Sequence, residues 1–286
     1  VDAMRTMLND LTFDGKVVIG EGERDEAPML FIGEKVGSGT GAKIDIALDP
    51  LEGTTITATG GPDALAVIAM AEEGGFLHAP DVYMEKIAVG GGLPAGVIDL
   101  DRSTAENMHA LADAKGVVPS ELMACVLDRP RHAKIIEDIR GTGARIKLIP
   151  DGDVAGVIAT AEEGTGIDIY FGTGGAPEGV LAAAALTCIG GQMEGRLIFR
   201  NDDERGRAHK AGIEDLQRKY ALDDLAHGDV LFAATGVTDG SMLRGVKRYA
   251  THVTTESIVM RARTGTVRWI RANHDVDRAL KGTIQN

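Results

Sequence analysis

The chain has 286 residues, enough for two domains of about 150 residues each or for one large α/β domain. A hydrophobic content of 44% beside 38 glycines excludes a disordered chain and indicates a compact fold with many tight turns. The formal net charge of −13 at pH 7 argues against a nucleic-acid or anionic-membrane surface, but it is compatible with a small phosphorylated substrate held by a few cations or a metal.

The first hundred residues predict a mixed α+β region. An amphipathic helix is expected at the start, where apolar residues recur at helical spacing: Val1, Met4, Leu8 and Leu11. No N-cap residue precedes this helix, so we expect native residues before it. Glycine-punctuated apolar runs then predict three strands, at residues 16–19, 43–48 and 65–70.

A capping box formed by Ser103 and Glu106 predicts a helix that runs to Lys115 and ends at Gly116. Strands and helices then alternate, with strands at 124–128, 145–149 and 167–171 and helices at 131–140, 153–161 and 177–189. Such alternation predicts a parallel sheet with crossover helices. Three further strands, at 229–234, 252–262 and 266–271, are expected to extend a sheet.

The change in pattern near residues 117–120 predicts a domain boundary. We therefore expect an N-terminal α+β domain over residues 1–118 and a C-terminal α/β domain over residues 119–286. Cys125 and Cys188 are the only cysteines, and so sparse a pair is more typical of reduced thiols than of a disulfide framework. No apolar run approaches the roughly 20 residues that span a bilayer, and no signal peptide is evident, so a cytoplasmic location without membrane contact is expected.

Charged residues follow each strand of the predicted parallel sheet, where ligands bind in such folds. They are Arg129 and Arg131 after the first strand, Asp151 and Asp153 after the second, and Glu178 after the third. Taken singly, the aspartates could simply cap helices and the glutamate could interact with a helix dipole. Because every turn on this edge is charged, we favour a ligand site.

The segment Asp49-Pro50-Leu51-Glu52-Gly53-Thr54-Thr55 carries a sharper signal, directly after the strand 43–48. Two carboxylates three residues apart on a sharp turn, with a carbonyl between them, are ligands that hard divalent cations prefer. Gly53 allows a close approach of the backbone, and if a helix begins here its first N–H groups would receive a phosphate. Gly20-Glu21-Gly22-Glu23 offers further carboxylates after the first strand. Metal-assisted phosphoryl chemistry uses all of these parts.

These motifs resemble those of a known family. Asp-Pro-Leu-Glu-Gly-Thr at 49–54 matches the signature of the lithium-sensitive, metal-dependent sugar-phosphate phosphatases. With Ile19-Gly-Glu-Gly-Glu-Arg-Asp-Glu-Ala-Pro-Met29, Ile149-Pro-Asp-Gly-Asp153 and Gly174-Gly-Ala-Pro-Glu-Gly179 in that order, the chain is similar to the class II fructose-1,6-bisphosphatases of bacteria from Val1 to about Val276. The resemblance implies a layered α/β sugar-phosphatase fold with its active site in the cleft between the two halves.

The resemblance also implies a role for each matching residue. Ligands of Mg²⁺ or Mn²⁺ would be Glu21, Asp49, Glu52 and Glu178, with the Leu51 carbonyl as an addition. The catalytic residues would be Thr54, whose hydroxyl orients the attacking water, and Glu21. The substrate would be bound by Gly53, beside the scissile phosphate, by Thr54 and Glu178, and by Tyr83, Arg129, Arg131, Asp151 and Asp153, which hold the sugar and its second phosphate.

Two features depart from the family pattern. Glu52 stands where relatives often carry Asp. In the family, a basic and an acidic residue from a helix that precedes Val1 complete the site, and the acid polarises the threonine; neither is in this sequence.

The implied reaction is metal-dependent hydrolysis of the 1-phosphate of fructose 1,6-bisphosphate to fructose 6-phosphate and phosphate, a step of gluconeogenesis. The implied assembly is a homo-oligomer such as a tetramer. Sedoheptulose-1,7-bisphosphatase or inositol-phosphate phosphatase activity would use the same metal site and stays open at this point. A non-catalytic phosphate-sensing protein is the other alternative, against which the intact set of acidic residues and Thr54 argues.

Overall fold

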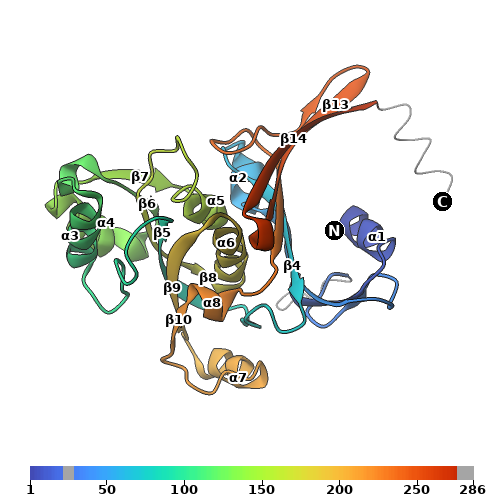
Figure 1. Ribbon diagram of the computed structural model, residues 1–286, viewed down its shortest axis with the longest axis horizontal. Helices are drawn as coiled ribbons and strands as arrows, with labels where there is room; N and C mark the ends of the chain where they lie inside the picture. The colour runs from blue at the N-terminus through green and yellow to red at the C-terminus, as the bar shows by residue number, and fades with distance from the viewer. Residues whose placement is uncertain (22–28, 276–286) are drawn as a thin grey trace.

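A computed structural model describes residues 1–21 and 29–275 as a mixed α/β fold built around two sheets (Figure 1), which confirms the predicted fold class. The first sheet contains β1 (Asp14–Ile19), β2 (Lys35–Val36), β3 (Lys43–Glu52), β4 (Leu65–Glu72), β11 (Leu231–Gly236), β12 (Lys247–Arg248), β13 (His252–Arg261) and β14 (Thr266–Asp275). The second contains β5 (Tyr83–Gly90), β6 (Met123–Leu127), β7 (Arg145–Ile149), β8 (Ile169–Gly175), β9 (Gly191–Ile198) and β10 (Lys219–Ala221).

The helices are α1 (Asp2–Asn9), α2 (Thr54–Thr59), α3 (Thr104–Lys115), α4 (Ala133–Gly141), α5 (Asp153–Ile158), α6 (Ala176–Ile189), α7 (Asp202–Lys210) and α8 (Leu222–Leu225). The strongest local prediction is confirmed to the residue, because α3 begins after the Ser103–Glu106 capping box and ends at Gly116 in a left-handed conformation. None of the described helices is both long and apolar enough to cross a membrane.

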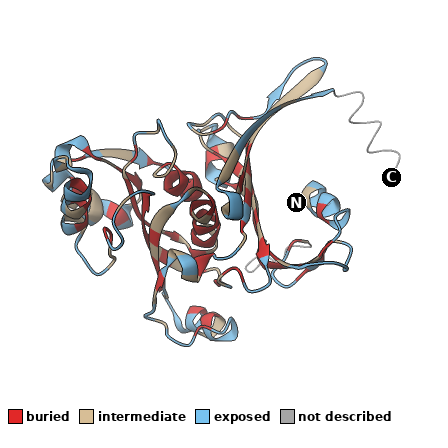
Figure 2. Ribbon diagram, viewed as in Figure 1, coloured by how far each residue is buried: buried red, intermediate tan, exposed pale blue. Residues whose placement is uncertain are grey.

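Helix α6 lies at the centre of the molecule and packs against strands of both sheets. Its residues Val180 to Leu186 are all buried, and they belong to a core cluster that includes residues of both sheets (Figure 2). A helix that is apolar on every face must be covered on every face, so this segment holds the two sheets together. The same cluster contains Cys125 and Cys188, both buried and free, as predicted.

The second sheet is only partly parallel. Its strand order is β10-β9-β5-β8-β6-β7, and β6 pairs in parallel with β7 and β8, as the alternation of strands and helices predicted. The expectation of a parallel sheet is wrong for the rest, because β5 lies antiparallel between β8 and β9. The alternating pattern of residues 124–189 carries no information about which distant strand pairs with the open edge of β8.

Each sheet contains strands from both sides of residue 118. The strand β5 comes from the first hundred residues but lies inside the second sheet, and β11 and β13 come from the last sixty but extend the first sheet beside β4. The tail therefore extends a sheet, as expected. The division into domains at residue 118 stays a prediction.

The segment expected to form a sharp turn after residue 48 is instead the last part of β3. Asp49 pairs with Val67 and Glu52 with Leu65, so β3 has one extra residue, a β-bulge. Pro50 has no N–H to donate to a neighbouring strand, and bulges are where strands tolerate proline. The bulge changes the direction in which successive side chains point. It therefore orients the side chains of Asp49 and Glu52, as the expected turn would have done.

Candidate active site

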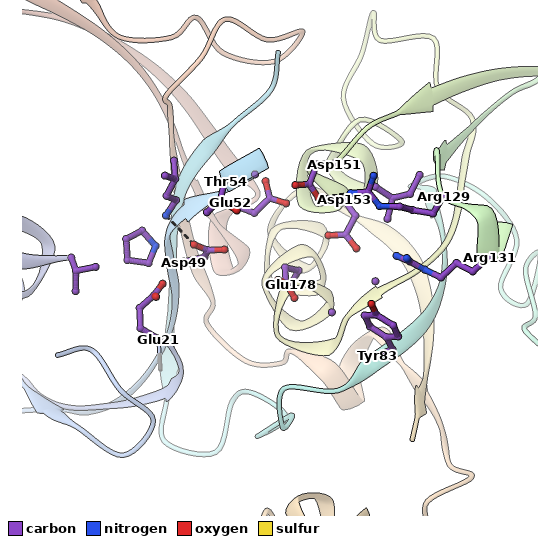
Figure 3. Close-up of a pocket in the computed structure, with 17 residues that line it drawn as sticks. Glu21, Asp49, Glu52, Thr54, Tyr83, Arg129, Arg131, Asp151, Asp153 and Glu178 are labelled. Carbon is purple, nitrogen blue, oxygen red and sulfur yellow. Dashed lines mark hydrogen bonds and ion pairs between the residues drawn. The ribbon is translucent and has the colours of Figure 1, made fainter. Parts of the chain in front are cut away.

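A cavity of about 520 Å³ lies at the ends of β3, β6, β7 and β8 (Figure 3). All of the residues that the sequence nominated line it: Glu21, Asp49, Leu51, Glu52, Gly53, Thr54, Tyr83, Arg129, Arg131, Asp151, Asp153 and Glu178. Gly22 and Glu23, which follow Glu21 in the Gly-Glu-Gly-Glu motif, lie outside the described residues. The structure therefore brings together segments that are more than a hundred residues apart in the chain.

Charge is distributed unevenly across this cavity. Glu21 and Asp49 lie on one side, and Glu178 lies near the middle. Both arginines, Arg129 and Arg131, lie on the other side, together with Asp151 and Asp153 (Figure 3). Clustered carboxylates are suited to a metal ion, and guanidinium groups to a phosphate. The cavity thus has an acidic side and a basic side, with a size typical of small-molecule sites.

The β3 bulge supplies the acidic side. The Leu51 N–H donates a hydrogen bond of 2.9 Å to Asp49 Oδ1, which fixes the carboxylate against the strand. Burial raises the pKa of Asp49 to about 6, the Leu51 N–H opposes this rise, and the charges of Glu21 and Asp151 add to it. When a cation approaches a half-buried carboxylate whose pKa is raised in this way, it stabilises the charged form of that carboxylate.

Glu52 is the most deeply buried of the acidic residues that line the cavity, at 3% exposed. Burial, followed by repulsion from Asp153 and Asp49, raises its pKa well above the ordinary value. Its Oε2 atom is buried and has no hydrogen-bond partner among the described residues. An unsatisfied buried carboxylate oxygen is costly in a folded protein, and this oxygen is chemically suited to coordinate a cation.

Glu178 lies in the first turn of α6, where the helix dipole favours a negative charge. Burial raises its pKa to about 7, and Asp153 contributes in the same direction while Lys86 opposes it. Its Oε2 atom is also buried without a partner in the described part of the chain. The carboxylate packs closely against Gly175, so a Cβ at that position would force the end of the Glu178 side chain to move.

Lys86 is a site residue that the sequence analysis missed. Its side chain is 1% exposed, and it forms a salt bridge with Asp153 and donates a hydrogen bond of 2.9 Å to the Gly175 carbonyl. The only signal in the sequence is its register on β5, which places Lys86 on the same buried face as Met84 and Ala88. It brings a positive charge beneath the cavity and holds Asp153 in place.

The basic side is fixed by His132, which follows both arginines. His132 is fully buried; its Nδ1 donates to the Leu127 carbonyl and its Nε2 accepts from the Thr173 N–H, both at 2.8 Å. These bonds fasten the turn after β6 to β8. Arg131 Nε then donates to the Thr173 carbonyl at 2.8 Å.

Arg129 and Tyr83 complete the basic side. An Arg129 Nη2 atom lies 3.6 Å from Asp151 Oδ1, and the Arg131 guanidinium carbon lies 5.0 Å from the centre of the Tyr83 ring. The Tyr83 ring therefore holds Arg131 by a cation–π contact. Both arginines face the cavity (Figure 3).

The acidic side fits a hard divalent cation. Its donors are carboxylate and carbonyl oxygens, the pKa values of Asp49, Glu52 and Glu178 are raised, and two of the buried oxygens lack partners. No three carboxylates of the described chain are already close enough to form a complete ligand set. Binding a cation would therefore draw the side chains together against their mutual repulsion.

A pH dependence follows from these shifts. The folded-state pKa values of Asp49 and Glu178 lie above their unfolded values of 3.8 and 4.5, so the folded, metal-free protein holds protons that the unfolded chain has released. This contribution to stability is complete below about pH 4 and is lost as the pH rises through about 6 and 7. We expect the melting temperature in excess chelator to fall more steeply between about pH 5 and 8 in the wild type than in Glu178→Gln. Parallel curves for the two proteins would contradict this.

Comparison with known proteins gives a family. A sequence profile described as bacterial fructose-1,6-bisphosphatase, glpX-encoded, matches residues 1–274. The chain is 46% identical over 292 aligned positions to a protein of Escherichia coli strain K12 named fructose-1,6-bisphosphatase 1 class 2, covering 97% of this chain and 86% of that protein. A Shigella flexneri protein named fructose-1,6-bisphosphatase class 2 matches with the same identity and coverage.

Proposed function

The chain belongs to the glpX-encoded family of bacterial fructose-1,6-bisphosphatases, and from this we propose that it hydrolyses the 1-phosphate of fructose 1,6-bisphosphate to fructose 6-phosphate and phosphate. This is a phosphatase reaction of gluconeogenesis. The observation that supports it is a cavity in which Glu21 and Asp49 lie opposite Arg129 and Arg131, because a sugar bisphosphate has one phosphate to be cleaved and one only to be held.

The family is metal-dependent, and we propose Mg²⁺ or Mn²⁺ for this chain. Glu21, Asp49, Glu52, Glu178 and the Leu51 carbonyl would hold the metal. When bound, it supplies positive charge that stabilises the phosphoryl oxygens and the leaving oxygen. The oxygen-only donor set and the two unpartnered buried oxygens support this assignment.

The chain's own residues would position the reactants. The Thr54 hydroxyl, at the first residue of α2, orients the attacking water, and Glu21 lies on the same side of the cavity. Gly53, with a positive φ of 85°, allows the backbone to approach the reacting phosphate. Tyr83, Arg129 and Arg131 hold the second phosphate, while Asp151 and Asp153 accept hydrogen bonds from the sugar hydroxyls.

We also propose a cytoplasmic location and a homo-oligomeric state such as a tetramer. Buried free thiols support a reducing compartment. The oligomeric proposal rests on the family resemblance alone, and sedimentation of the purified protein tests it.

The proposed reaction is tested by phosphate release from a panel of substrates with Mg²⁺ or Mn²⁺ present. We expect kcat/KM to be highest for fructose 1,6-bisphosphate and lower for sedoheptulose 1,7-bisphosphate and inositol 1-phosphate. A higher kcat/KM for sedoheptulose 1,7-bisphosphate or inositol 1-phosphate would instead identify the protein as a phosphatase of that substrate. Absence of turnover with every substrate, in a protein that still binds fructose 6-phosphate, would support a phosphate-sensing role.

Replacement of Arg131 by alanine separates recognition from chemistry. A hydrogen bond to a charged group is worth about 1.5–3 kcal/mol, so kcat/KM for fructose 1,6-bisphosphate should fall by about 10- to 100-fold. Fructose 1-phosphate lacks the distal phosphate, and its kcat/KM should change little. Arg140→Ala, which removes the same charge from an exposed position in the last turn of α4, is the control and should leave both values unchanged. Equal losses on both substrates for Arg131→Ala would contradict the assignment.

A further inference from the structure

A third guanidinium lies against the same tyrosine as Arg131. Arg200 comes two residues after β9, and Tyr83 at the start of β5 pairs with Ile198 at the end of β9. The Arg200 guanidinium carbon is 4.7 Å from the centre of the Tyr83 ring, and the Arg131 guanidinium carbon is 5.0 Å from the same centre. Arg200 therefore contacts a residue that lines the cavity but is not itself among the lining residues, and neither its sequence position nor any motif points to it.

Arg200 is held in place from behind by Glu204. The Arg200 Nε and Nη2 atoms donate to Glu204 Oε1 at 2.8 and 2.5 Å, and the Arg200 backbone N–H donates to Oε2 at 2.7 Å. The Glu204 side chain is 2% exposed, and its backbone N–H is bound by the Asn201 side chain that caps α7. One edge of the guanidinium is thus clamped to a buried carboxylate.

The other edge of the guanidinium is available. Within the described chain, no hydrogen bond to Arg200 Nη1 is present, and the side chain is 45% exposed. A guanidinium fixed on one edge and open on the other is preorganised for an oxyanion, because little rotamer entropy is lost on binding.

We propose that Arg200 joins Arg131 in binding the non-reacting phosphate of the substrate, with Glu204 as its positioning residue. This inference rests on the proposed function for the identity of the sugar bisphosphate. In this arrangement Tyr83 positions both guanidinium groups, because each of them contacts its ring. Arg200 would then contribute to the choice of bisphosphates over monophosphates.

The first test compares two substrates in Arg200→Met. We expect kcat/KM for fructose 1,6-bisphosphate to fall about 10-fold, the effect of one exposed charged hydrogen bond, and that for fructose 1-phosphate to stay within about 2-fold. Arg205→Met is the matched control, because Arg205 is an exposed arginine of α7 that pairs with Asp202 and does not contact Tyr83. It should leave both values unchanged. No loss on the bisphosphate, or equal losses on both substrates, would overturn the proposal.

The second test does not depend on turnover. Fructose 6-phosphate carries only the non-reacting phosphate, so its dissociation constant, measured by calorimetry, should rise about 10-fold in Arg200→Met. If the wild type released no phosphate but this binding still weakened in the variant, the proposed activity would fail while the subsite stood. Unchanged binding in an active enzyme would overturn the subsite and leave the activity intact.

Removing Arg200 leaves the buried Glu204 carboxylate without its partner and can unfold α7. The double variant Arg200→Met/Glu204→Gln removes both charges and gives the same two comparisons if the single variant does not fold. Glu204→Gln alone tests the positioning role. This variant should raise KM for fructose 1,6-bisphosphate severalfold with kcat unchanged, and it should leave KM for fructose 1-phosphate as it is. A lower melting temperature with no change in either KM would show that Glu204 is only structural and would overturn its positioning role.

Discussion

Replacing Asp49 by asparagine should lower kcat by about 10³-fold or more, because metal-ion stabilisation of a phosphoryl transition state is worth several kcal/mol. Asparagine has nearly the same shape and can still accept the 2.9 Å hydrogen bond from the Leu51 N–H. What it removes is the charge that would hold the cation. Turnover should be measured across a wide range of Mg²⁺ and Mn²⁺ concentrations, so that weakened metal binding is distinguished from a slower reaction.

The same variant should be no less stable than the wild type when metal is absent. Asp49 has a pKa raised to about 6 by its burial, so above that pH the wild-type fold carries a buried, repelled charge that asparagine lacks. We expect the melting temperature of Asp49→Asn in excess chelator at about pH 8 to equal or exceed that of the wild type. An inactive variant that is also clearly destabilised would mean that Asp49 is a structural residue.

Asp45 offers a control on the same strand. Its carboxylate accepts hydrogen bonds from the Gly74 N–H at 2.8 Å and from His78 at 3.4 Å, and its pKa is lowered although burial acts in the opposite direction. Asp45→Asn should therefore lose about 1–2 kcal/mol of unfolding free energy and keep its turnover. Asp49→Asn should thus lose activity without losing stability, and Asp45→Asn should lose stability without losing activity.

Replacing Thr54 by alanine should lower kcat by about 10²-fold, in the range expected when a group that positions a proton-transferring water is lost, with a modest change in KM. Thr54 is an exposed residue that lines the cavity at the start of α2, so removing its hydroxyl has little structural cost. Thr54→Ser keeps the oxygen but loses the β-branch that restricts χ1, and it should retain part of the rate.

Thr55 is the matched control for this position. It follows Thr54 on the same helix, is exposed, and is not among the residues that line the cavity. Thr55→Ala changes the helix propensity of α2 in the same way and should leave kcat unchanged. If Thr54→Ala were as fast as Thr54→Ser, or if both alanine variants slowed equally, the hydroxyl of Thr54 would have no role in orienting the water.

Local signals in the sequence were sufficient for some elements. Helix α3 was predicted to the residue because its capping box and terminal glycine act within one turn of the chain. Most candidate site residues were nominated from short motifs for a similar reason, because the six residues 49–54 already combine oxygen ligands, a glycine and a threonine. Tyr83 lies in no such motif and was nominated only through the family resemblance. The structure then placed every one of them on one cavity.

Other features depend on contacts between distant segments, and no local pattern contains them. The sequence around Asp49 predicted a turn, and the pairing of β3 with β4 made it a bulged strand instead. The antiparallel insertion of β5 beside β8 likewise follows from which edge is free, not from the alternation of strands and helices.

The sequence by itself determined the fold class, the positions of most helices and the residue types of a metal-dependent phosphatase, because hydrophobic period, caps and short motifs are local properties. Only the tertiary structure decided what surrounds those residues. Lys86 became part of the site because β5 carries it beneath Asp153, and Arg200 because β9 ends beside Tyr83. Each side chain acquires its role from a strand pairing across the chain, and such pairings are selected by the packing of the whole core.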